Sequence, residues 1–127
     1  MATVLQEGRY AGEFLISEGE FQISRDNITI AATSGVIKPG TVLGKITASG
    51  KYKPSPDTGA DGSQTAVAIA LYGCDATSVD QKIAAITRLA EVNGTILTYD
   101  ATVSDATKKA AKATQLAGIT GGAIIVR

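Results

Sequence analysis

Four acidic residues in the sequence are spaced in a way that could support acid–base or metal chemistry. Glu18 and Glu20 stand two residues apart and would share one face of a strand, where repulsion would raise the pKa of one carboxyl group and suit it to proton transfer. They flank Gly19 in a turn-like stretch, however, which favours a solvated turn. Asp57 and Asp61 lie in a Gly-rich segment that resembles a calcium loop but lacks the third acid and the bidentate Glu. We therefore expect neither pair to form a catalytic or metal site.

The nucleophilic side chains lack partners that would activate them. The sequence contains no His, which removes the usual general base and the commonest metal ligand. Cys74 is the single cysteine, and we expect it to serve as a small buried hydrophobic residue. Ser104 and Lys108 are four residues apart, but an exposed lysine would stay charged and could not act as a base. The glycine-rich residues 118–122 follow an expected helix, whereas a phosphate-binding loop precedes one. These features predict a protein that is not an enzyme and uses no cofactor.

Composition limits both the size of the core and the class of partner. The 127 residues fit one domain, and 44% of them are apolar, although only 5% are aromatic and none is Trp. A core of Ile, Val, Leu and Ala buries little area per residue, and such small cores often depend on oligomerisation. The 12 basic and 12 acidic residues balance, which argues against nucleic acid as a direct partner. We find neither a signal-peptide pattern nor an apolar run of 18 residues, so we expect no membrane partner and folding in a cytoplasm.

We expect residues 1–12 to form a flexible N-terminal arm, because they are small and polar and include two glycines. Residues 13–127 should form a single domain. Short alternating or continuous apolar runs bounded by turn residues predict strands over residues 21–24, 28–30, 42–47, 65–72 and 123–126. We expect residues 25–27 to form a break between the first two of these strands.

Turn-forming residues separate these strands. Pro39-Gly40 predicts a type II turn, because Pro fixes the first φ and Gly accepts a positive one. Gly44, inside an expected strand, predicts a bulge or a close backbone approach. Residues 50–64 contain two of the three prolines and are expected to form an exposed loop.

Residues 78–94 are compatible with two structures. A capping-box pattern at their start and the helical spacing of Ile83, Ile86 and Leu89 favour a helix. Asn93-Gly94 would end such a helix, but the same pair also suits a hairpin turn between two strands. The residues alone leave both structures open.

Residues 104–118 predict a helix. Ser104 can cap its start, and Gly118 can adopt the left-handed conformation at its end. A narrow apolar stripe with helical spacing consists of Ala106, Ala110, Ala113, Leu116 and Ala117. Three lysines lie off this stripe: Lys108, Lys109 and Lys112.

An ordered set of sequence segments resembles the lambda-type head decoration proteins of bacteriophages. The segments are EFLISE at 13–18, SRD at 24–26, KPGTVLGKI at 38–46, RLAEVNG at 88–94, and the C-terminal helix with its Gly- and Ile-rich tail ending at Arg127. Their order and spacing cover nearly the whole chain from residue 13. The resemblance implies a mainly β fold with one or two short helices, as a β-clip-like small barrel or sandwich. It also implies that residues 78–94 form two strands.

The same resemblance implies a function. Proteins of this family are expected to be made in the cytoplasm of the host and to bind the exterior of the expanded capsid as homotrimers at three-fold sites, with the major capsid protein as partner. The resemblance extends to prophage-encoded members, and it implies an N-terminal arm that orders on the capsid. We take as candidate capsid-binding residues the end of the arm and the first apolar cluster: Arg9, Tyr10, Phe14, Leu15 and Ile16.

Two other functions remain as alternatives. The first is a small non-catalytic β-clip binding or carrier module, which would need an exposed lysine at a hairpin tip. Lys45 lies instead between Gly44 and Ile46 in an expected strand. The second is an enzyme subunit, against which the absence of His argues.

Overall fold

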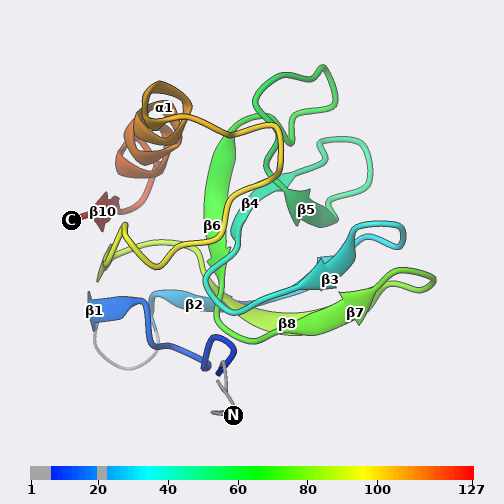
Figure 1. The fold of residues 1–127 in the computed structure, drawn as a ribbon, viewed down its shortest axis with the longest axis horizontal. Helices are drawn as coiled ribbons and strands as arrows, with labels where there is room; N and C mark the ends of the chain where they lie inside the picture. The colour runs from blue at the N-terminus through cyan, green and yellow to red at the C-terminus, as the bar shows by residue number, and fades with distance from the viewer. Residues whose placement is uncertain (1–6, 20–22) are drawn as a thin grey trace, which may run out of the picture.

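The protein is mainly β, with one helix among the residues that the computed structural model describes, which are 7–19 and 23–127 (Figure 1). This confirms the expected fold class. In chain order the elements are β1 (Leu15–Glu18), β2 (Arg25–Ile30), β3 (Gly35–Ile37), β4 (Val42–Lys45), β5 (Tyr52–Pro54), β6 (Ala66–Ala70), β7 (Cys74–Ala76), β8 (Gln81–Ile86), β9 (Ala90–Val92), α1 (Ala106–Ala117) and β10 (Ile124–Val126).

Five strands close into a small barrel in the order β2-β5-β4-β6-β8. Its longest pairing is antiparallel, between β2 and β8, and runs from Arg25↔Ile86 to Ile30↔Gln81. A barrel of so few strands has a narrow interior, which suits small and branched side chains better than aromatic rings. The buried cluster of the barrel fits this expectation. It consists of Ile28, Ile30, Leu43, Ala68, Ala70, Ile83 and Ala85, with Ile37 and Ala76 added from the neighbouring strands β3 and β7.

A three-stranded sheet and α1 pack beside the barrel. In this sheet β9 is central, with β1 antiparallel and β10 parallel to it. Phe14, Val92 and Ile124 pack into one core together with Leu116 of α1 and Ile69 of the barrel. Figure 1 shows β1 and β10 at one side of the molecule, while β3 and β7 form a two-stranded ribbon at the other side.

Residues 78–94 form β8 and β9, so the two-strand structure is confirmed and the helix is wrong. Ile83 and Ala85 face the barrel interior, whereas the intervening Ala84 is only half-buried. This period of two, with β2 and β6 as hydrogen-bonded neighbours of β8, overrides the local helix signal. Asn93-Gly94 follows β9, and the amide of Gly94 donates to the carbonyl of Arg127.

Two turn predictions are confirmed. The amide of Thr41 donates to the carbonyl of Lys38 over 3.1 Å, and Gly40 has a φ of +86°, as a type II turn requires. Gly44 lies where the register between β4 and β6 shifts. A Cβ at Gly44 would stand 1.8 Å from the carbonyl oxygen of Ser63, so this crossing admits only glycine.

Three expectations about the strands and loops need correction. The expected break at residues 25–27 is part of β2, because ion pairs occupy the charged side chains of Arg25 and Asp26. The expected strand at 21–24 lies partly outside the described residues, and its last two residues form a turn. Residues 50–64 are not a simple exposed loop, because they contain β5 and the buried Ser55 and Ser63. Cys74 is half-buried at the edge of the barrel core.

The predicted helix is present, but its capping residues and its buried face differ from those expected. It begins at Ala106 with Asp105 as its cap in place of Ser104, and Gly118 has a φ of −92°, which is not left-handed. Ala106, Ala110 and Ala117 of the expected apolar stripe are exposed. Lys112 is only 2% exposed, since its long side chain reaches polar backbone groups that alanine could not satisfy.

Candidate functional site

The described end of the N-terminal arm lies on the surface. Arg9 pairs with Glu13 at 3.5 Å, and Tyr10 is 59% exposed. The hydroxyl of Tyr10 donates to Glu7 over 2.6 Å, and this contact raises the pKa of Tyr10 above its usual range. Residues 7–9 border a hollow of about 510 Å³ whose other wall is the Ile37–Pro39 segment. Local contacts therefore hold this segment, and it buries no large side chain of its own.

The first apolar cluster divides between core and surface. Phe14 is 1% exposed and belongs to the core beneath the sheet, where its ring lies against Gly40. Leu15 is half-buried and packs against the same core. Ile16 is 55% exposed because β1 bulges: Leu15 faces Val92 and Ser17 faces Glu91, which leaves Ile16 as the extra residue. The five candidate residues are thus adjacent in the chain, but only Arg9, Tyr10 and Ile16 present their side chains outward.

The outer face of the sheet adds residues that sequence reasoning missed. Ser17 and Ile125 are both cross-strand neighbours of Glu91, so these three side chains share the face that points away from the core. Ile125 is 36% exposed and Leu89 39% exposed, and both line a shallow groove of about 330 Å³. Only the pairing of β1, β9 and β10 brings these positions together, so no local signal could have found them.

Leu89 has an unusual backbone conformation at the end of this face. Its φ is +53°, in the left-handed region that non-glycine residues rarely adopt. Its carbonyl accepts from the amide of Gly19 over 2.8 Å, and a Cβ at Gly122 would stand 2.5 Å from the Leu89 side chain. Close contacts from two neighbouring segments therefore hold Leu89 in place and leave its side chain partly in solvent.

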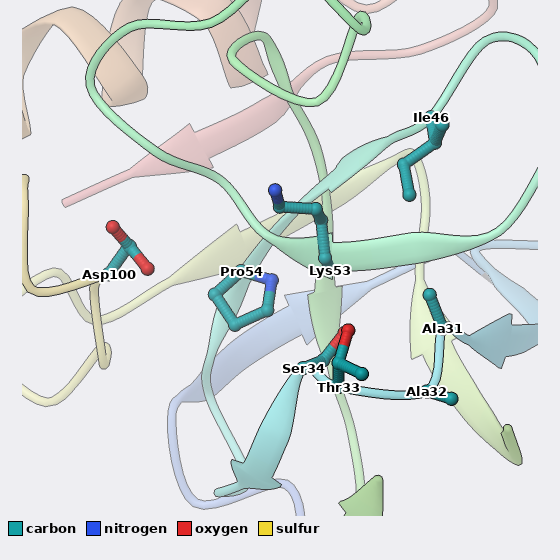
Figure 2. A pocket seen from close by; sticks show the side chains of 8 residues that line it. All are labelled: Ala31, Ala32, Thr33, Ser34, Ile46, Lys53, Pro54 and Asp100. Atoms are coloured by element: carbon teal, nitrogen blue, oxygen red, sulfur yellow. The ribbon is translucent and has the colours of Figure 1, made fainter. Parts of the chain in front are cut away.

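A second hollow, of about 350 Å³, lies between the turn that follows β2 and strand β5 (Figure 2). Thr33, in that turn, has a φ of +72°. The charged groups at its rim have partners elsewhere: Lys53 Nζ lies 3.9 Å from Asp61, and Asp100 accepts from the amide and hydroxyl of Thr102. Figure 2 shows Lys53 and Asp100 on either side of Pro54. These side chains do not place a nucleophile beside a base.

Three of the acidic residues weighed for acid–base catalysis or metal binding form hydrogen bonds or ion pairs within the fold. Glu18 accepts from Arg25 Nε over 2.9 Å and from Ser24 Oγ over 2.7 Å, and the Arg25 contact above all lowers the pKa of Glu18. Glu20 lies outside the described residues. Asp57 pairs with Lys108, and Asp61 accepts from both the amide and the hydroxyl of Ser63.

No group of three or more metal-ligating side chains occurs in residues 7–19 and 23–127. The remaining nucleophile, Cys74, is half-buried, and burial raises the pKa of its thiol. Lys45, weighed as a carrier lysine, is the last residue of β4 and pairs with Tyr52, so it does not stand at a hairpin tip. The helix of the described chain is too short to cross a bilayer.

Comparison with known proteins adds one finding. The family model for bacteriophage lambda head decoration protein D matches residues 4–121 of the chain. No curated protein matches the sequence.

Proposed function

The chain belongs to the family of bacteriophage lambda head decoration protein D, and on that premise we propose that it binds the outer surface of the expanded capsid as a homotrimer at three-fold sites. Membership identifies a structural protein of the virion that associates with the capsid. The proposed partner is the major capsid protein, which the decoration protein meets after its own synthesis in the host cytoplasm.

One observation carries this proposal at the level of residues. An exposed segment, residues 7–12, leaves the domain at a residue that the core holds firmly, Phe14. Next to this root, Tyr10 and Ile16 expose large apolar side chains that no other part of the described chain covers. A segment anchored in this way can contact a second protein while the domain keeps its structure.

The five candidate residues receive different roles in this proposal. Arg9, Tyr10 and Ile16 contact the capsid, and Leu15 contributes its exposed part. Phe14 fixes the segment to the domain from within the core. A binding segment of this kind can add a strand to a neighbouring sheet and so gain main-chain hydrogen bonds.

Three copies of a weak contact suffice for stable decoration. When three segments belong to one trimer, the second and third bind at a high effective concentration, and avidity exceeds the affinity of one segment by about 10²–10⁴. The proposal requires no catalytic group.

Deletion of residues 2–12 tests the proposal. The truncated protein retains Phe14 and β1, so we expect native circular dichroism but capsid binding weakened by at least about a hundredfold, because three segments are lost together. Binding is measured by co-sedimentation with expanded, undecorated capsids. Val36→Ser, at a 68% exposed position on the β3–β7 ribbon, is the matched control and should bind like the wild type. Undiminished binding by the folded truncation would contradict the proposal.

A further inference from the structure

Lys112 is a charged residue buried inside the domain, and capsid binding does not account for it. Only 2% of its surface is exposed, although most alanines of the same helix are exposed. Burial of an ammonium group is costly unless each of its three N–H groups finds an acceptor. The partners of Lys112 therefore define what the residue does.

The three acceptors of Lys112 all belong to residues 55–64. Its Nζ donates to Ser55 Oγ over 2.9 Å, to the carbonyl of Pro56 over 2.6 Å and to the carbonyl of Gln64 over 2.5 Å. These residues stand at the two ends of the loop between β5 and β6, so one ammonium group joins both ends of the loop to α1. Burial lowers the pKa of Lys112, while the carboxylates of Asp57 and Asp100 oppose this shift.

Further contacts extend the same connection. Ser55 Oγ donates to the carbonyl of Ser63, the group that crosses closely over Gly44. Gln115, one turn after Lys112, accepts from the amide of Ala66 over 2.8 Å. Lys108, one turn before it, pairs with Asp57 at 3.6 Å. In the described chain, every buried side-chain polar atom has a hydrogen-bond partner, and this includes the buried side-chain polar atoms of this network.

We infer that Lys112 is a latch that couples α1 to residues 55–64, so that helix and loop undock together as one unit. Loss of the ammonium group leaves the Pro56 and Gln64 carbonyls without this donor, which loosens the loop ends and the buried face of α1 simultaneously. This role is independent of the capsid and holds in the free protein. The latch links two segments that lie about fifty residues apart in the sequence.

Hydrogen exchange of the full-length protein at neutral pH tests the latch. In folded Lys112→Met, whose side chain keeps an apolar stem without charge, amides of residues 62–66 and of α1 should both exchange about tenfold faster or more. Lys109→Met is the matched control, because Lys109 is exposed on the same helix, and both segments should keep wild-type exchange. Unchanged exchange in Lys112→Met, or faster exchange of the loop alone, would overturn the inference.

A second measurement keeps the inference testable if Lys112→Met does not fold. In the wild-type protein, amides of residues 62–66 and of α1 should lose protection with the same dependence on low denaturant concentrations, because one opening event exposes both. Lys112 should react with an amine-specific acylating reagent only through this opening, at a rate that rises in parallel. Different denaturant dependences for the two segments would refute a shared opening.

Discussion

The barrel and the neighbouring three-stranded sheet differ in how far their apolar side chains are exposed to solvent. Ile30, Leu43 and Ala70 inside the barrel have no exposed surface, and the strands close on themselves without an edge. In the sheet, β1 and β10 stand at the two edges, and Ile16 and Ile125 are partly exposed. Closure removes the open strands that would otherwise pair with other chains. The barrel therefore offers no open strand edge to another chain, while the sheet and its N-terminal extension expose the side chains for which contacts with the capsid are proposed.

Ion pairs connect these two regions. Glu18, at the end of β1, binds Arg25, at the start of β2. The next residue, Asp26, pairs with Arg88, which lies just before β9. The sheet is thus attached to the barrel by charged contacts at both of these junctions, in addition to the shared apolar core.

The largest expected effect concerns the root of the sheet. Phe14→Ala should lower the free energy of unfolding by about 3–5 kcal/mol, since it removes a buried aromatic ring and leaves a cavity. Chemical denaturation followed by circular dichroism measures the change. Tyr10→Ala, four residues away and exposed, should change stability by less than about 0.5 kcal/mol. A small effect of Phe14→Ala would mean that the core beneath the sheet is not formed as described.

The next effect separates binding from stability. The double variant Tyr10→Ala, Ile16→Ser should keep wild-type stability but reduce capsid binding by about tenfold or more, because three copies of each apolar contact are lost. Co-sedimentation with expanded capsids and denaturation of the same preparation give the two values. Equal binding by the variant would place the contact surface elsewhere on the molecule.

A smaller effect concerns the junction and its dependence on pH. Arg25 lowers the pKa of Glu18 in the folded protein, so the ionised carboxylate favours the folded state. This contribution to stability is fully present above the ordinary pKa of a Glu carboxyl group, about 4.3. It is lost as the pH falls through the lowered pKa of the folded state. Glu18→Gln should therefore cost about 0.5–1 kcal/mol at neutral pH, with allowance for partial exposure.

The difference in free energy of unfolding between Glu18→Gln and the wild type should decrease on acidification. It should disappear once Glu18 of the wild type is protonated in both the folded and the unfolded state. Urea denaturation across the acid range measures it. Glu13→Gln, which disrupts only the exposed pair with Arg9, is the control and should change the free energy of unfolding less than Glu18→Gln at neutral pH. A difference that stays constant down to the lowest pH would show that the ion pair does not stabilise the junction.

The smallest effect is expected at Cys74. Cys74→Ala should leave capsid binding unchanged and lower stability by less than about 1 kcal/mol, because the side chain is half-buried and small. Loss of binding by a folded Cys74→Ala protein would reveal a role for the thiol.

Strands β4 and β6 of the barrel could be predicted from the sequence, because apolar runs and turn residues are local signals, whereas β5 lies in a segment expected to be an exposed loop. Val42 to Lys45 and Ala66 to Ala70 form strands where apolar runs and the Pro39-Gly40 turn indicated them. The resemblance to a family resolved residues 78–94, where local signals were balanced. Asp26 and Arg25 were read as a break because their partners, Arg88 and Glu18, are not visible in the local pattern.

The buried face of the helix and the exposure of the candidate site residues could be predicted less well from the sequence. An apolar stripe predicts a buried face only where the helix packs on an apolar surface, and α1 packs partly on the carbonyls of Pro56 and Gln64. Lysine satisfies these groups, so Lys112 is buried, while Ala106, Ala110 and Ala117 are exposed. The candidate site residues lie within eight positions of the sequence, but the bulge in β1 and the core beneath it separate the side chains of Phe14 and Ile16.

Cryo-electron microscopy of expanded capsids incubated with the protein would show whether it decorates the three-fold positions as trimers. We predict density for three copies around each three-fold position on the outer surface, with residues 7–18 against the major capsid protein and the β3–β7 ribbon away from it. Single copies or pairs at other positions, or the ribbon facing the shell with residues 7–18 in solvent, would rule out this mode of binding.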